Sequence, residues 1–104
     1  MNTLLIDTSD NKRISVGLRI NDKEYSKSQK VDRDKAQATL PLIEKVLKGK
    51  SLSLKDIDNI EVNTGPGSFT GIRVGMSIAN ALSFSLKIPV NGKKVGDFAQ
   101  ASYK

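Results

Sequence analysis

The sequence predicts a single α/β domain built on a mixed β-sheet. Three short segments with strand character occupy the first third of the chain, and a strand, helix and strand alternate in the second half. Strands that come first and then alternate with helices are typical of a sheet with both antiparallel and parallel neighbours. A chain of 104 residues supports one hydrophobic core, and it is too short for two lobes with a cleft between them. We therefore expect one compact domain with a sheet of about five strands.

The three early strands are expected at residues 3–9, 13–20 and 24–31. The first, TLLIDTS, is an apolar run that ends in small polar residues, as a buried strand does before a turn. The second, RISVGLRI, alternates apolar and polar residues and so reads as half-buried. A short turn joins it to a polar third strand, which predicts an antiparallel meander.

A helix is expected over residues 34–49. Ala36, Leu40, Ile43 and Leu47 recur at spacings of four, three and four, which places them on one helical stripe. Pro41 interrupts this pattern. Either the helix starts late, with the proline in its first turn, or it is kinked at the proline.

The second half of the chain continues the alternation. A helical turn is expected at residues 51–59, a buried strand at 60–64, an apolar helix at 70–87 and a further strand at 88–92. Residues 95–103 are expected to form a short helix or a frayed tail.

The composition excludes several classes of site. The chain has no cysteine and no histidine, which excludes disulfides, zinc sites built on these residues, and catalytic triads that use histidine. We see no signal peptide and no span of about 20 apolar residues, so we expect a cytoplasmic protein. The formal net charge of +6 favours an anionic partner such as RNA. The basic residues are scattered, however, and an ordinary solvated surface is the alternative.

The stretch NTGPGSFTGIRVG, residues 63–75, holds four of the eight glycines. Its spacing fits neither the Walker A loop nor the dinucleotide-binding fingerprint. Pro66 lies between two glycines, and the hydroxyl of Ser68 or Thr70 is placed to cap the following helix. The loop either offers a helix N-terminus to an anion or only turns the chain.

A second candidate site is IDTS, residues 6–9. A carboxylate at the end of a first strand, followed by two hydroxyls, suits a group that faces a metal or a phosphate. The alternative is an aspartate that caps its own turn.

The helix after the glycine loop has one face almost without side chains. Gly71, Gly75, Ala79 and Ser83 recur every four residues. Glycine costs roughly 1 kcal/mol relative to alanine inside a helix, so two on one face indicate a close approach to another backbone. The approaching segment is either the first helix of the same chain or a helix from a partner chain.

Several motifs, taken in order, resemble the TsaB (YeaZ) family. They are LLIDTS, TLPLIEKVL, LSLKDID, GPGSFTGIRVG and ANALSFSLKIPV. The resemblance as a whole runs in order from residue 1 to about residue 100. The resemblance implies the actin/Hsp70-like ATPase fold, which is ribonuclease-H-like, and members usually carry two such lobes. It implies that residues 1–104 are a single N-terminal TsaB-like domain and that the second lobe is absent.

The resemblance also implies a function. Members of this family are non-catalytic subunits of the complex that makes threonylcarbamoyladenosine in tRNA, where they bind and activate the catalytic TsaD subunit through helices. A TsaE-like ATPase belongs to the same complex, tRNA is contacted indirectly or through a basic surface, and a homodimer is implied for the subunit alone. Carried over to this sequence, the partner interface comprises Ala36, Thr39, Leu40, Ile43, Leu47, Gly71, Arg73, Val74, Gly75, Ile78, Ala79 and Leu82.

The resemblance implies that any phosphate-binding site in this chain is a vestige of an ATPase ancestor. No catalytic residue and no metal site is expected, and no cofactor beyond weak ATP or ADP binding. The vestigial phosphate-binding residues would be Asp7, Thr8, Ser9, Gly65, Gly67 and Ser68. A small nucleotide-binding or hydrolysing domain is the alternative function, and a separate RNA-binding domain is a third. Many members have His-Ser/Ala-Glu where this chain has Lys35-Ala36-Gln37.

Overall fold

The computed structural model describes residues 1–101. It contains a four-stranded sheet, two α-helices and one short 3₁₀ helix. These elements are β1 (Asn2–Asp7), β2 (Arg13–Ile20), β3 (Lys23–Lys30), α1 (Lys35–Gly49), η1 (Leu54–Asp56), β4 (Asn59–Val62) and α2 (Phe69–Leu86).

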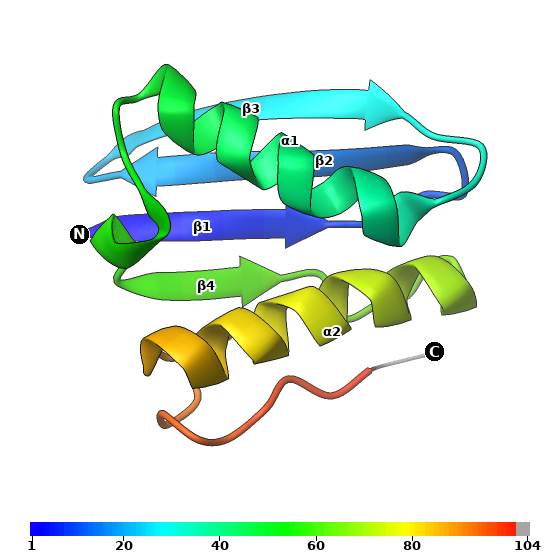
Figure 1. The fold of residues 1–104 in the computed structure, drawn as a ribbon. Coiled ribbons are helices and arrows are strands. Elements are labelled where there is room, and N and C mark those ends of the chain that lie inside the picture. The colour runs from blue at the N-terminus through cyan, green and yellow to red at the C-terminus, as the bar shows by residue number, and fades with distance from the viewer. Residues whose placement is uncertain (102–104) are drawn as a thin grey trace.

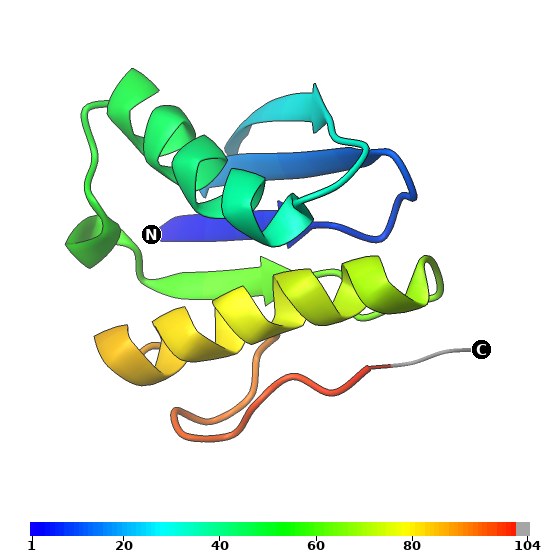
Figure 2. The same ribbon diagram turned by 45° about the vertical axis from the view of Figure 1, so that its right-hand side comes forward.

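The sheet is mixed, and its strands lie in the order β3-β2-β1-β4. The meander β1-β2-β3 is antiparallel, whereas β4 runs parallel to β1. Both helices pack on the same face of this sheet, with α1 packed mainly over β2 and touching β3, and α2 running alongside β4 (Figure 1). Figure 2 shows the same two layers from a second direction. In the described part of the chain, no helix covers the opposite face.

The core lies between the sheet and the helices. Leu4 of β1 pairs with Leu18 on one side and with Ile60 on the other, and all three are fully buried. The register therefore aligns the apolar residues of neighbouring strands on one face. The helix α1 closes this layer with its buried residues Thr39, Leu42, Ile43, Val46 and Leu47.

Two details of α1 correct the expectation from sequence. Ala36 and Leu40 are exposed, so they lie beside the buried stripe and not within it. The helix begins at Lys35, so Pro41 lies inside it, and a late start with proline in the first turn is wrong. Pro41 is exposed on the solvent-facing side of α1.

The expected fifth strand at residues 88–92 is reduced to one bridge, between Val90 and Ile60. Two backbone hydrogen bonds hold it, from Ile60 N to Pro89 O and from Asn91 N to Ile60 O. Pro89 has no N–H to donate, and Asn91 turns away with a φ of 52°. The sheet therefore has four strands and not about five.

The side chain of Asn91 extends this contact along the edge of β4. Val62 N donates to Asn91 Oδ1 (2.8 Å), and Asn91 Nδ2 donates to Val62 O (3.0 Å). One amide thus satisfies both backbone groups of the last residue of β4, in the way that a neighbouring strand would.

The segment after α2 runs back along that helix (Figure 1). Asn80 holds it, because Asn80 Nδ2 donates to Ala99 O (3.2 Å) and Ala99 N donates to Asn80 Oδ1 (2.9 Å). Residues 95–101 are not helical, and the rest of the expected helix at 95–103 lies outside the described residues. None of the helices seen in residues 1–101 is long and apolar enough to cross a membrane.

Candidate functional site at the start of the second helix

The hydroxyl of Thr8 joins the end of β1 to the first turns of α2. Thr8 is fully buried. Its Oγ1 donates to Gly71 O (2.5 Å) and accepts from Gly75 N (3.0 Å). These two backbone groups are four residues apart, on one turn of the continuous helix α2. The hydroxyl therefore bridges one turn of α2 and fixes the helix against the strand.

This contact explains two of the glycines on the small-residue ridge of α2, which is the face formed by Gly71, Gly75, Ala79 and Ser83. A Cβ added at Gly71 would overlap Thr8 O, and one added at Gly75 would overlap Thr8 Oγ1. The close approach that the spacing predicted is therefore real, but it is made within the chain. It is made by the end of β1, joined at Gly71 by the Lys35 side chain, and not by the body of α1.

The prediction that this ridge receives a partner helix is wrong. Gly71, Gly75, Ala79 and Ser83 are all buried inside the described chain, so the ridge has no surface left for a second molecule. The pattern of small residues indicated that a backbone approaches closely, and it carried no information on which segment supplies it.

A polar network joins the ends of β1 and β4. Ser9 Oγ and Ser9 N donate to Asp7 Oδ1 at 2.6 and 2.9 Å. Asn63 Nδ2 donates to Asp7 Oδ2 (3.2 Å) and to Ser9 Oγ (3.1 Å), while Asn63 Oδ1 accepts from Gly65 N (2.9 Å). The aspartate therefore does cap its own turn, and it also holds the neighbouring strand.

The charge of Asp7 is stabilised by this network. Burial alone would raise the pKa of its carboxyl, but the hydrogen bonds from Ser9 and Asn63, with the positive charge of Lys35, outweigh that effect and lower the pKa below the usual value of 3.8. Asp7 is therefore ionised at neutral pH, and its negative charge disfavours a bare phosphate at this position.

The glycine loop is fastened to the same turn. Ser68 N donates to Ser9 O (2.7 Å), and a Cβ added at Gly67 would overlap Ser9. Ser68 Oγ accepts from Gly71 N (3.2 Å) and so caps α2, as its position predicted. The Gly65–Pro66 peptide bond is cis.

The two motifs that the sequence presented separately therefore form one site. The structure brings together Asp7, Ser9, Gly65, Gly67 and Ser68 at the start of α2. Thr8 is the exception among the proposed phosphate-binding residues, because its hydroxyl is buried and bonded to α2. A phosphate-facing role for Thr8 is wrong, and phosphate binding by the other five stays a prediction.

Sequence reasoning missed two residues of this site. Lys35 Nζ donates to the carbonyl oxygens of Thr8 (3.4 Å) and Asp10, which ties the first residue of α1 to the turn after β1. Asn63 supplies the amide that links the two strand ends. The signals for them were slight: a lysine at a helix start and an asparagine directly after a buried strand. In residues 1–101, no group of three or more acidic, histidine or cysteine side chains is placed to hold a metal ion.

The remaining residues of the expected partner interface fall into a buried group and an exposed or partly exposed group. Thr39, Ile43 and Leu47 of α1 are buried in the core, as is Ala79 of α2, and these positions cannot contact a partner. Those that stay wholly or partly exposed are Ala36, Leu40, Arg73, Val74, Ile78 and Leu82.

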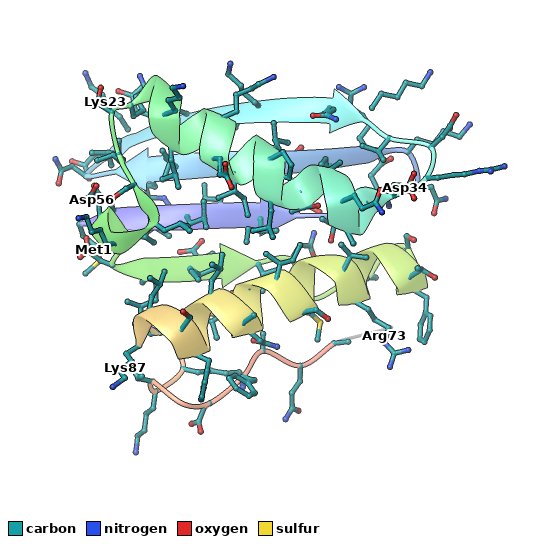
Figure 3. The ribbon with its side chains drawn as sticks, in the orientation of Figure 1. Met1, Lys23, Asp34, Asp56, Arg73 and Lys87 are labelled. Atoms are coloured by element: carbon teal, nitrogen blue, oxygen red, sulfur yellow. The ribbon has the colours of Figure 1, made fainter. Side chains whose placement is uncertain are left out.

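A hollow of about 360 Å³ lies between the starts of the two helices, and Ala36 and Val74 both line it. Figure 3 places Asp34 and Arg73 at this same end of the molecule. Arg73 lies over the ring of Phe69 at 5.1 Å from its centroid. The accessible parts of the two helices therefore meet along one side of the molecule.

Comparison with known proteins gives consistent matches. The family profile described as "TsaD: tRNA N6-adenosine threonylcarbamoyltransferase" matches residues 23–92. The chain is 42% identical over 89 residues to the tRNA threonylcarbamoyladenosine biosynthesis protein TsaB of Buchnera aphidicola subsp. Schizaphis graminum, covering 86% of this chain and 42% of that protein. It is 36% identical over 87 residues to the protein of the same name in Haemophilus influenzae, covering 84% and 36% of the two chains.

The solved structure of YeaZ from Pseudomonas aeruginosa superimposes with a TM-score of 0.81 at 31% identity, over 89% of this chain and 43% of that one. The chain thus spans less than half the length of these relatives. The expected actin/Hsp70-like, ribonuclease-H-like fold is confirmed, with four strands in the sheet. The motifs, the fold and the comparisons agree, and the chain belongs to the TsaB (YeaZ) family.

Proposed function

We propose that this chain is a non-catalytic subunit in the synthesis of threonylcarbamoyladenosine in tRNA, and that it binds and activates a TsaD-like catalytic subunit through the exposed sides of α1 and α2. In this proposal the chain works in the cytoplasm, needs no cofactor of its own, and shares the complex with a TsaE-like ATPase. When the catalytic subunit is absent, the same surface pairs two copies of the chain.

The names of the relatives support a role for this chain in the synthesis of threonylcarbamoyladenosine. Both TsaB proteins compared above are named for tRNA threonylcarbamoyladenosine biosynthesis. The matching profile is described as the transferase that acts on tRNA adenosine. These names describe proteins more than twice as long as this chain, and we extend the process to it on the strength of the shared fold and motifs.

The chemistry of the chain supports a helper and not a catalyst. The sequence contains neither histidine nor cysteine, which removes the commonest general bases and nucleophiles. At the candidate site, the Thr8 hydroxyl is bonded to α2 and the Ser68 hydroxyl caps that helix. The polar groups of the site are thus used to hold strand, loop and helix together.

The observation that carries the interface is the exposure of apolar side chains along the outer sides of the two helices. Leu40 is 42% exposed on α1, and Phe69 is 56% exposed at the start of α2. Val74, Ile78 and Leu82 of α2 are partly exposed, and Val74 lines the hollow between the starts of α1 and α2. Exposed apolar groups that cluster on neighbouring elements commonly mark a protein interface.

The test is co-elution with the TsaD-like subunit of the same organism on a sizing column. Leu40→Glu places a charge on the exposed side of α1, and we expect it to abolish co-elution while leaving the melting temperature within a few degrees of wild type. Val95→Glu is the matched control, because Val95 is 54% exposed but lies outside both helices. Gly75→Leu is unsuitable here, because its side chain would collide with Thr8 and damage the fold.

Two results would overturn this proposal. One is wild-type chain that does not co-elute with the subunit. The other is a Leu40→Glu variant that co-elutes as well as wild type and Val95→Glu do.

A further inference from the structure

The C-terminal end of α1 and the edge strand β3 carry a group of lysines that the proposed function has not used. Tyr25 and Lys27 of β3 line a hollow of about 370 Å³ together with Val46, Gly49 and Lys50 at the end of α1. Lys50 Nζ lies over the ring of Tyr25, 3.5 Å from its centroid. Two of the lysines, from distant parts of the chain, are therefore held beside each other.

Three further lysines lie close by in sequence on the same two elements. Lys23 lies two residues before Tyr25 and thus on the same side of β3, about 13 Å along the strand from Lys27; Figure 3 places it at the end of the molecule where α1 finishes. Lys45 lies one turn before Gly49 on α1, and Lys48 lies in the last turn. We define the lysine patch as Lys23, Lys27, Lys45, Lys48 and Lys50, all of which are exposed.

The charges of the lysine patch are not neutralised within the described chain. In residues 1–101, the side-chain ion pairs are both made by Arg19, with Glu24 and Glu61 on the opposite face of the sheet. The carboxylates next to the patch in sequence are Asp22, Glu24 and Glu44. Of these, Glu24 is paired with Arg19 on the opposite face of the sheet, which leaves Asp22 and Glu44. Five lysines against two carboxylates leave an excess of three positive charges, half of the formal charge of the whole chain.

We propose that the lysine patch binds the sugar–phosphate backbone of tRNA. This inference rests on the proposed function, because it assigns the contact with the substrate RNA to β3 and the C-terminal end of α1, whereas the catalytic subunit would bind at Leu40 and along α2. A cluster of unpaired lysines attracts a polyanion and releases its counterions. Lysine also suits phosphate as a point charge that requires no fixed geometry.

The details of the patch favour phosphate contacts over base recognition. The ring of Tyr25 is half-buried and one of its faces is covered by Lys50, so it holds a lysine in place and does not offer an open platform for a base. Binding should accordingly be independent of sequence and steeply dependent on salt. A second copy of the chain would bring the same lysines to the contact and be repelled.

The experiment measures the affinity of the chain for an unmodified tRNA transcript by fluorescence anisotropy between about 50 and 200 mM salt. We expect the double variant Lys27→Ala/Lys50→Ala to bind more weakly at every salt concentration. The slope of log affinity against log salt should fall in magnitude by about 1 for each lysine removed. Lys27→Arg/Lys50→Arg should bind like wild type, because the charges remain.

The matched control is Lys93→Ala/Lys94→Ala, which removes the same charge from two exposed lysines in the segment after α2. We expect it to keep most of the wild-type affinity, and circular dichroism should show that all variants are folded. Equal losses from both double variants would overturn the proposal, since binding would then follow net charge alone. So would wild-type chain that fails to bind tRNA, or that binds polyglutamate as tightly as tRNA, which would identify an acidic protein as the partner.

The outcome is separable from the test of the proposed function. Lys27→Ala/Lys50→Ala should still co-elute with the TsaD-like subunit, because the patch lies away from Leu40 and the start of α2. If co-elution is lost with this variant, the two surfaces are one and the assignment of a separate RNA contact is wrong. If wild type never co-elutes but tRNA binding follows the lysine patch, the subunit role fails and the RNA contact stands.

Discussion

The Thr8 hydroxyl accepts a hydrogen bond from the amide of Gly75, at 3.0 Å and across 67 positions of sequence. With its second bond, to Gly71 O, it contacts one turn of α2 through two backbone groups. This arrangement makes the end of the first strand and the glycine motif parts of one buried junction. It accounts for why both positions of the helix have no side chain.

Thr8→Val should destabilise the fold although it conserves volume. The variant loses both hydrogen bonds, and it places a methyl group against a buried N–H and C=O. Leaving buried polar groups unpaired costs about 1–3 kcal/mol, and we expect the free energy of unfolding in urea to fall by that amount. Thr8→Ser keeps the hydroxyl and should lose less. If Thr8→Val were as stable as Thr8→Ser, the hydroxyl would have no structural role.

Alanine at Gly71 or Gly75 should be more damaging than alanine at Gly49. A Cβ at either of the first two positions would overlap Thr8, whereas a Cβ at Gly49 would meet nothing within 4 Å. We expect losses of about 1–3 kcal/mol at positions 71 and 75 from overpacking. Gly49→Ala should be neutral or stabilising by about 0.4–1 kcal/mol. Urea denaturation of the three variants measures this, and equal effects at all three would contradict the close contact with Thr8.

Asp7→Asn should change how stability depends on acid. Folding lowers the pKa of Asp7, so its contribution is present above the unfolded pKa of about 3.9 and is lost as the pH falls through the folded pKa. The variant carries no titrating group at this position. It should therefore be less stable than wild type at pH 7, and the difference should shrink below about pH 4.

Thermal melts at several pH values test this. The control is Asp97→Asn, since the Asp97 side chain does not belong to the network at the strand ends, and it should follow wild type. A difference between Asp7→Asn and wild type that stayed constant from pH 7 to about pH 2 would show that the charge of Asp7 makes no contribution.

Asn91→Gly should loosen the edge of β4. Glycine accepts the positive φ of this residue but removes the amide that bonds Val62 N and Val62 O. Each net hydrogen bond contributes about 1 kcal/mol, and we expect faster hydrogen exchange at the Val62 amide. Asn21→Gly is the matched control, because Asn21 also has a positive φ (56°) but its side chain accepts from the amino group of Met1 and does not bond to β4. Unchanged protection at Val62 in the Asn91 variant would count against the clamp.

Much of the fold was predictable, because burial imposes a period on the sequence. The alternation of RISVGLRI predicted β2 over residues 13–20, and the structure has the strand at Arg13–Ile20. The expected helix at 70–87 is found at Phe69–Leu86. Ser68 caps it, as a hydroxyl at that position predicted. Strand alternation and helix capping depend on near neighbours, so they can be read from a short window.

The parts that failed depend on which segments meet. The fifth strand is lost because Pro89 lacks a donor and Asn91 turns away. The small-residue ridge of α2 predicted that another segment approaches the helix closely, but it did not identify Thr8 as the residue that does so. The amides of Asn63, Asn80 and Asn91 each hold a segment distant in sequence, and no local pattern distinguishes them from asparagines in turns.

The two borders of the sheet differ in what they allow at high protein concentration. Beyond β4, Pro89, Val90 and the Asn91 amide occupy the backbone groups that another strand would need. Within the described chain β3 has no neighbour on its outer side, yet its lysines would face like charges if two molecules met there. Edge-to-edge pairing of molecules through their sheets is thus resisted in two ways. At β4 the backbone groups are already bonded, and at β3 the lysines of two molecules would repel each other. Because salt screens only repulsion, concentrated salt would weaken the barrier at β3 and leave the one at β4 intact.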